Sequence, residues 1–495
     1  MSVRRIGRAL LIVLILLAGV ELVLRAVGLG DPQERFALQA GLNDFARYLA
    51  PDELAPGGWR TQIFGNAAQE THIPPRDGRI RVLLLGGADT SALPGDRLAA
   101  ALDAAQPGRA HEVVNLGRPG YGSERLRILL RQALPALRPD VVVLHCGHGE
   151  FLEPGLGVAL AGSAGPAIWN ELRLVNVMAG LLVSDPSRVA WAAGPEPEER
   201  RNWPEPSPIA SHEASRRVYE VFRFHLESMV RAGRAAGARV VLCTVASNML
   251  FCPAVSAHLE PLTPEQQTEF DRLRATAHAL LPSRLVAGLL RTGPDRPPLA
   301  PGWVMWGEAL IKRPPEAGPP PSRGRRPPAL RCLGAPFEGD PLWPPPEFWD
   351  PRLHAFMATL AAFHERQLRP EERAAVEEAA DALQRAVALS PGHAHAAFEL
   401  GLCLYLLGDD ARAVELLRRA QCLDLRPNRG NDVTNGIMRE VAAKSGAALA
   451  DIDALVASAC PGGLVGFEVL MDASTLQPGA RAAVAEAMVP AIVGE

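Results

Sequence analysis

Five short, nearly continuous apolar runs recur along the 495-residue chain, and several of them end at glycine. They span residues 79–85, 111–115, 140–144, 239–244 and 447–452. Runs of this length without polar alternation are typical of strands buried on both faces of a parallel sheet. Helical stretches, such as residues 123–137 and 215–236, lie between them. Strands that alternate with helices predict a right-handed α/β layer fold, whose working groups follow the carboxyl ends of the strands.

Composition excludes several classes of protein. Hydrophobic residues make up 48% of the chain, which is enough to bury more than one core and excludes a wholly disordered protein. The 51 Lys and Arg residues nearly balance the 55 Asp and Glu residues, so no basic field favours nucleic acid as a partner. Seven Cys residues lack C-x-x-C spacing, and His393 and His395 fit a solvated helix start better than metal ligation. We therefore expect no cofactor and no metal.

The amino-terminal segment has the pattern of a membrane anchor. Three cations, Arg4, Arg5 and Arg8, precede an apolar stretch over residues 9–24. Glu21 and Arg25 are four residues apart, so they can pair on one helical face. We expect a single-pass helix in the cell inner membrane, with a cytoplasmic amino terminus and the bulk of the chain periplasmic or otherwise extracytoplasmic. A cleaved signal peptide and a buried core helix are the alternatives.

Two insertions interrupt the strand and helix order. Residues 293–350 are Pro-rich but hold four of the eight Trp residues, which favours a locally packed arm over a free tether. Residues 371–425 are helical, and apolar positions recur at an offset of 34, as in tetratricopeptide (TPR) repeats; an ordinary helical hairpin is the alternative. The resulting division is 1–28 anchor, 29–78 linker or amino-terminal extension, 79–290 first part of the α/β domain, 291–370 Pro-rich arm and connecting helix, 371–425 TPR-like insert, and 426–495 last part of the α/β domain.

Seven segments at or near the expected strand ends occur in the order found in one enzyme family. They are LLLGGADTS (83–91), EVVNLGRPGYGS (112–123), VVVLHCGHGEFLEPG (141–155), VVLCTVASN (240–248), DLRPNRGNDVTNGIMREVA (424–442), ALADIDALVASACPGGLVG (448–466) and LMDASTLQPGARAAVAEAM (470–488). Together they resemble the SGNH (GDSL-like) hydrolases, in particular the bacterial membrane-anchored subset with a tetratricopeptide insert before the last strand. The resemblance extends from about residue 80 to the carboxyl terminus, except for the Pro-rich arm. It implies a flavodoxin-like three-layer fold and an ester-hydrolase ancestry.

The same resemblance assigns catalytic positions, most of which hold the wrong residue type. The family's G-G-S corresponds to Gly86-Gly87-Ala88, its G-H-N-E to Gly147-His148-Gly149-Glu150, and its D-x-x-H to Asp472-Ala473-Ser474-Thr475. Gly117 and Asp472 keep the expected types. Ala88, Gly149 and Thr475 replace the nucleophilic Ser, the Asn that donates to the oxyanion, and the general-base His.

The replacements remove the groups that ester hydrolysis needs. Ala88 has no hydroxyl, Gly149 has no side-chain amide, and Thr475 cannot accept a proton near neutral pH. All twelve His residues lie at or before His395, so no shift of alignment supplies the missing base. Asp89 adds a carboxylate that opposes negative charge at the presumed oxyanion site.

A rebuilt site is the competing interpretation. Thr90 or Ser91 would replace the nucleophile, with His145 or His148 as the base, although His148 is more simply a loop residue. Gly86-Gly87 lacks the spacing of a phosphate-binding loop.

We therefore expect a catalytically degenerate SGNH-like protein, a pseudoenzyme, that acts by binding or assembly. Its expected partners are the membrane, through the amino-terminal helix, and a protein, through the TPR-like helices; a small-molecule or glycan ligand is not identified. The first alternative is an active esterase or acyl hydrolase that acts on cell-envelope glycans or lipids. The second is a TPR-mediated scaffold.

Overall fold

The computed structural model describes residues 3–27, 29, 49–61, 71–118, 121–151, 173–174, 177, 211–290 and 359–494. The predictions for the Pro-rich segment 293–350 and its Trp residues lie outside these ranges, as does much of the predicted linker.

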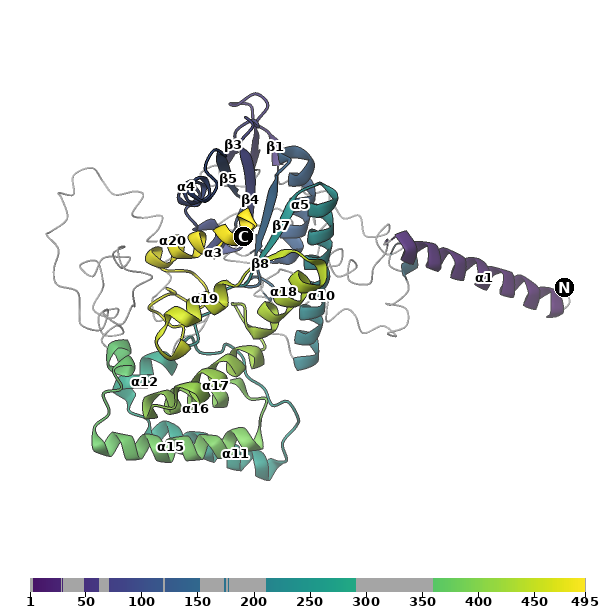
Figure 1. Cartoon of the computed structure of the whole chain (residues 1–495). Coiled ribbons are helices and arrows are strands. Elements are labelled where there is room, and N and C mark those ends of the chain that lie inside the picture. Colours follow the sequence, from purple (N-terminus) through teal and green to yellow (C-terminus); the bar gives the residue numbers. More distant parts are fainter. Residues whose placement is uncertain are drawn as a thin grey trace.

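The five predicted strands form one parallel sheet (Figure 1). They are β4 (Ile80–Gly86), β5 (His111–Asn115), β6 (Val141–His145), β7 (Arg239–Cys243) and β8 (Ala448–Ala450). Their spatial order is β5-β4-β6-β7-β8, which is the flavodoxin-like order in which the first strand lies between the second and the third. Most predicted boundaries agree to within one or two residues, and the expectation of an α/β fold with a parallel sheet is confirmed.

Helices cover both faces of this sheet because its strands are apolar on both sides. In β4, Leu83 and Leu85 point into one hydrophobic core, whereas Val82 and Leu84 point into the other. The first core is covered by α5 (Ser123–Leu137), α10 (His212–Ala235) and α18 (Asp432–Ser445). The second is covered by α4 (Gly95–Ala105), α20 (Pro478–Ala487) and α21 (Val489–Val493). Shorter helices complete this domain: α3 (Ala88–Ser91), α19 (Ile452–Ala459) and a 3-10 turn over Pro461–Gly463.

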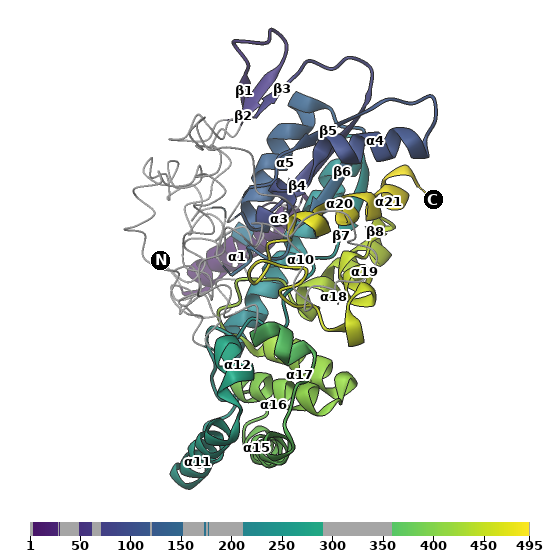
Figure 2. The ribbon, with the colours of Figure 1, turned by 90° about the vertical axis from the view of Figure 1, so that its left-hand side faces the viewer.

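A separate layer of helices lies beyond the carboxyl ends of the strands (Figures 1 and 2). It comprises α11 (Pro264–Leu280), α12 (Ser283–Leu290), α15 (Pro370–Leu389), α16 (Ala394–Leu407) and α17 (Asp410–Leu423). The insert predicted at 371–425 therefore consists of three helices, and α11, which precedes the Pro-rich segment, packs against α15. This layer is tied to the sheet through the amide of Gln421, which donates to the carbonyl of Asn248 after β7 at 3.1 Å.

The prediction of a solvated helix start at His393 is wrong. His393 is the N-cap of α16, and its ring accepts a hydrogen bond from the backbone of Ala396. The side chain is nevertheless buried, and its ring packs against those of Phe270 and His258. Burial lowers the pKa of His393, helped by the nearby positive charge of Arg274. The loop after β7 and helix α11 pack on the start of α16 and exclude water from His393. The local sequence does not contain this tertiary contact.

The amino-terminal part contains one long helix and a small sheet. Helix α1 (Val3–Val27) carries the expected pair, since the guanidinium of Arg25 donates to Glu21 at 2.9 Å. Within the described part of the chain, no helix combines the length and the hydropathy that crossing a membrane requires. The segment predicted as linker or extension includes three short antiparallel strands, β1 (Leu49–Pro51), β2 (Trp59–Thr61) and β3 (His72–Ile73).

Candidate functional site

The first strand end places a carboxylate, rather than a hydroxyl, at the centre of the candidate site. Strand β4 ends at Gly86, and the single turn α3 begins at Ala88, the position at which the sequence comparison predicts a nucleophile. The next residue, Asp89, is only 2% exposed. Its Oδ1 accepts a hydrogen bond from the backbone N–H of Thr90 at 2.8 Å.

Two histidines from the end of β6 surround this carboxylate. Oδ2 of Asp89 lies 3.3 Å from Nε2 of His145 and 3.5 Å from Nε2 of His148. Nδ1 of His148 accepts the backbone N–H of Gly430 at 2.8 Å, so in the neutral ring the proton is on Nε2, facing Asp89. His148 thus lies in a loop, as predicted, but it is buried and oriented from both sides.

Electrostatics keep Asp89 ionised. Burial alone would raise the pKa of Asp89, but the charges of His145 and His148 outweigh burial and lower the pKa to about 2. Burial lowers the pKa of His145, and this effect exceeds the opposing attraction of Asp89. At neutral pH the site therefore contains a buried carboxylate beside a neutral His145.

Thr90 and Ser91, the possible replacement nucleophiles, have different environments. The hydroxyl of Thr90 is fully buried; it donates to the carbonyl of His145 at 2.9 Å and lies 3.1 Å from Nδ1 of the same ring. This close approach requires glycine at position 86, because a Cβ there would overlap the Thr90 hydroxyl and the His145 carbonyl. Ser91 is exposed, and its hydroxyl donates to the carbonyl of Ala88 at 2.7 Å.

Gly117 and Gly149, the two positions predicted to supply oxyanion donors, are both packed against other parts of the chain. The backbone N–H of Gly117 donates to Oδ1 of Asn115 at 2.9 Å, and the Asn115 amide donates to the carbonyl of Thr90 at 2.7 Å. At Gly149, an added Cβ would overlap the carbonyl of Tyr121 and lie 2.8 Å from the nitrogen of Gly122. An asparagine cannot enter position 149 unless the loop before α5 moves.

Asp472 and Thr475 form a closed turn. The hydroxyl of Thr475 donates to Oδ2 of Asp472 at 2.9 Å, and the backbone N–H groups of Ser474 and Thr475 donate to Oδ1 at 2.8 and 2.7 Å. The turn is held on the loop after β7, since the amide of Asn248 donates to the carbonyl of Asp472 at 3.0 Å. Direct contacts thus connect the residues that follow β4 with those at the ends of β5 and β6. Asp472 and Thr475 are instead held by the loop after β7.

A second buried polar network lies next to these loops and was not predicted from the sequence. The hydroxyl of Ser123, at the start of α5, donates to Glu150 at 2.6 Å and lies 2.9 Å from Nδ1 of His225. Nε2 of His225 lies 2.6 Å from Glu124, and Arg127 donates to the same carboxylate at 3.1 Å. Burial opposes the charge of Glu124, but His225 and Arg127 lower its pKa to about 2.

This network connects α5, α10 and the loop after β6. Its members come from positions up to 102 residues apart. Of these residues, the sequence analysis had named only Glu150, as part of the motif at residues 147–150.

The donor geometry also bears on metal binding. In the described ranges, no group of three or more His, Cys, Asp or Glu side chains is arranged to hold a metal ion. At the Asp89 cluster the reason is chemical, because the nitrogen of His148 that faces Asp89 carries a proton and has no lone pair to offer.

Comparisons with known proteins give little further information. No protein-family model matches the chain, and no curated protein is a significant match. Among solved structures, the chain is similar to a "putative acylhydrolase" from Bacteroides fragilis at 14% sequence identity and a TM-score of 0.18. The alignment covers 48% of this chain and 88% of that protein. Two proteins need not share a fold at so low a TM-score, so nothing below depends on this likeness.

Proposed function

We propose that this chain is an SGNH-like protein that has lost ester hydrolysis and acts by binding or assembly. The flavodoxin-like strand order and the family-like segments at the strand ends support the ancestry. The loss of activity is supported above all by the oxyanion position. There the N–H of Gly117 is bonded to Asn115, and Gly149 is packed against the loop at Tyr121.

This arrangement opposes catalysis in a way that a missing nucleophile alone would not. An oxyanion hole needs donors that are free to receive developing negative charge, and removing one donor costs about 100-fold to 1,000-fold in rate. Here one donor is occupied, another is absent, and the ionised Asp89 repels an oxyanion from the same loops. Asp472, the retained acid, is hydrogen-bonded within its own turn and has no histidine to orient.

A serine-directed fluorophosphonate probe tests the proposal. We expect no covalent labelling of the full-length protein above that of a heat-denatured sample, with an active serine esterase as the positive control. Intact-mass measurement would detect an adduct, and peptide mapping would locate it. Labelling at Ser91, Thr90 or another hydroxyl would contradict the proposal.

The alternative, an active esterase with a rebuilt site, is favoured by one observation. The Thr90 hydroxyl lies 3.1 Å from Nδ1 of His145, and Nε2 of the same ring lies 3.3 Å from Asp89, so the residue types and their order suit a nucleophile, a base and an orienting carboxylate. Two features oppose it: the Thr90 hydroxyl is fully buried, and its proton is directed at the carbonyl of His145. Substitution of Thr90 by Val would abolish probe labelling if this alternative were correct.

We also propose that residues 1–28 attach the chain to a membrane, with the remainder extracytoplasmic. The cationic start and the apolar stretch that follows support this part of the proposal. The helices α15 to α17 would then offer a TPR-like surface to a protein partner. Close packing of Gly401 against Leu417, where an added Cβ would lie 2.8 Å from the leucine, supports a repeat-like helical pair.

A further inference from the structure

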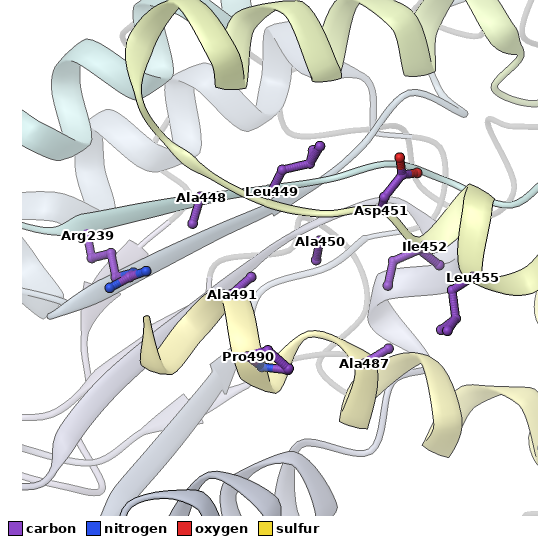
Figure 3. A pocket seen from close by; sticks show the side chains of 10 residues that line it. All are labelled: Arg239, Ala448, Leu449, Ala450, Asp451, Ile452, Leu455, Ala487, Pro490 and Ala491. Carbon is purple, nitrogen blue, oxygen red and sulfur yellow. The ribbon is translucent and has the colours of Figure 1, made fainter. Parts of the chain in front are cut away.

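A groove of about 400 Å³ lies between the edge strand β8 and the helices α20 and α21. Figure 3 shows Arg239 at one end of it and Asp451 at the other. The remaining walls are apolar or small: Ala448, Leu449, Ala450, Ile452, Leu455, Ala487, Pro490 and Ala491. The groove is separate from the Asp89 cluster, with which it shares no residue.

Strand β8 offers free backbone groups along this groove. It pairs with β7 in parallel, and the N–H of Thr244 donates to the carbonyl of Ala450 at 3.2 Å. Successive residues of a parallel strand bond alternately to either side, so the N–H and carbonyl of Leu449 face away from β7. No other group in the described ranges bonds to them, and the Leu449 side chain is 36% exposed.

Arg239 supplies a cation at the end of the groove. The guanidinium of Arg239 has no hydrogen bond or ion pair with any residue that the structure describes, although it lies against Gly494. Asp451, by contrast, accepts hydrogen bonds from Arg439 at 2.8 Å and from the hydroxyl of Thr244 at 2.8 Å. No described residue neutralises Arg239, so within the described part of the chain the groove presents a positive charge near the amino end of β8.

We propose that this groove binds the carboxyl-terminal end of an extended peptide segment of a partner protein. The peptide adds to β8 as a short strand and places its terminal carboxylate on Arg239. Because Arg239 precedes β7 residues that pair with the start of β8, the added strand runs antiparallel to β8. A lipid chain in the same place would leave the polar groups of Leu449 buried without partners, whereas a peptide backbone satisfies them.

Selection from a C-terminally displayed random hexapeptide library on the immobilised full-length protein tests this proposal. We expect enrichment of peptides with apolar or β-branched residues at alternate positions. The best peptide, made synthetically, should bind at least tenfold more weakly after amidation of its carboxyl terminus, since a charge-assisted bond is lost. N-methylation of its backbone nitrogens should abolish binding, because it removes strand pairing without altering the protein.

Variants provide the controls. Arg239→Gln should weaken binding as much as amidation does, whereas Arg109→Gln, at an exposed arginine before β5, should leave it unchanged. Leu449→Pro removes the outward N–H of β8 and should abolish binding. Failure to enrich any peptide would overturn the proposal. Binding of the amidated or the N-methylated peptide as tight as that of the unmodified peptide would also overturn it. So would a dimer in solution that Leu449→Pro dissociates, because a second copy would then occupy the groove.

Discussion

Replacement of Asp89 by Asn removes one charge from the centre of the candidate site and preserves its shape. The side-chain oxygen that remains can accept the backbone N–H of Thr90, and the amide NH2 group then takes the place of the oxygen that faces His145 and His148. The change therefore removes the negative charge together with the acceptor that faces the two histidines.

The magnitude follows from the pKa of Asp89, which falls from 3.8 to about 2 in the folded protein. One pKa unit corresponds to about 1.4 kcal/mol, so the shift corresponds to about 2 kcal/mol while the two histidines are charged, and this value is an upper bound at pH 7, where His145 is neutral. Because the folded pKa is below the unfolded value, this stabilisation is complete above about pH 4. It is lost as the pH falls from about 4 towards 2.

Urea unfolding of the wild type and of Asp89→Asn at pH 7 and pH 2.5 measures this contribution. We expect the variant to be less stable by up to about 2 kcal/mol at pH 7, with about a third of the full difference left at pH 2.5. Asp381→Asn, an exposed position on α15, controls for the loss of a carboxylate. A variant as stable as the wild type at pH 7, or a difference independent of pH, would refute the assigned environment of Asp89.

Three further outcomes are expected. Gly149→Ala should destabilise the protein by about 1 to 3 kcal/mol in urea unfolding, because the new Cβ overlaps the loop before α5, whereas Gly436→Ala, with open space around it, should be neutral or stabilising; equal effects would contradict the packing. Ser123→Ala should lower the free energy of unfolding by about 1 to 3 kcal/mol, since the buried Glu150 loses a hydrogen-bond donor. An unchanged unfolding midpoint would contradict this contribution of the Ser123 hydroxyl. The full chain should remain with membranes after carbonate extraction, whereas a form lacking residues 1–30 should not; a soluble full chain would contradict the anchor.

The parallel sheet could be predicted from the sequence because its strands are apolar on both faces. Residues 80–86 and 141–145 contain almost no alternation, and only a strand covered by helices on both sides buries such a run. The ends of β4, β5 and β6 could also be predicted, because a glycine lies at or shortly after each of them. The helices of the insert were predicted from their apolar periodicity, but the contribution of α11 was not, since 89 residues separate its end from the start of α15.

The candidate site was predicted only where local motifs determine it. Ala88 and Thr475 were predicted as site positions from their places in the motifs, and this assignment stays a prediction. The bond from Gly117 to Asn115 was not predicted, because Asn115 looks like an ordinary strand residue. The partners of Asp89 were likewise missed, since His145 and His148 lie more than 50 residues further along the chain and only the parallel pairing of β4 with β6 brings them together.

Hydrolysis of a short acyl ester by the double variant Ala88→Ser/Thr475→His tests the central claim most directly. This variant restores the nucleophile and the base, but it leaves the N–H of Gly117 bonded to Asn115 and Gly149 without an amide. We predict that neither the wild type nor the double variant exceeds the buffer rate by more than about twofold, because the N–H of Gly117 is bonded to Asn115 and position 149 supplies no amide. Turnover by the wild type, or a rate at least about 100-fold above buffer in the double variant, would contradict the account.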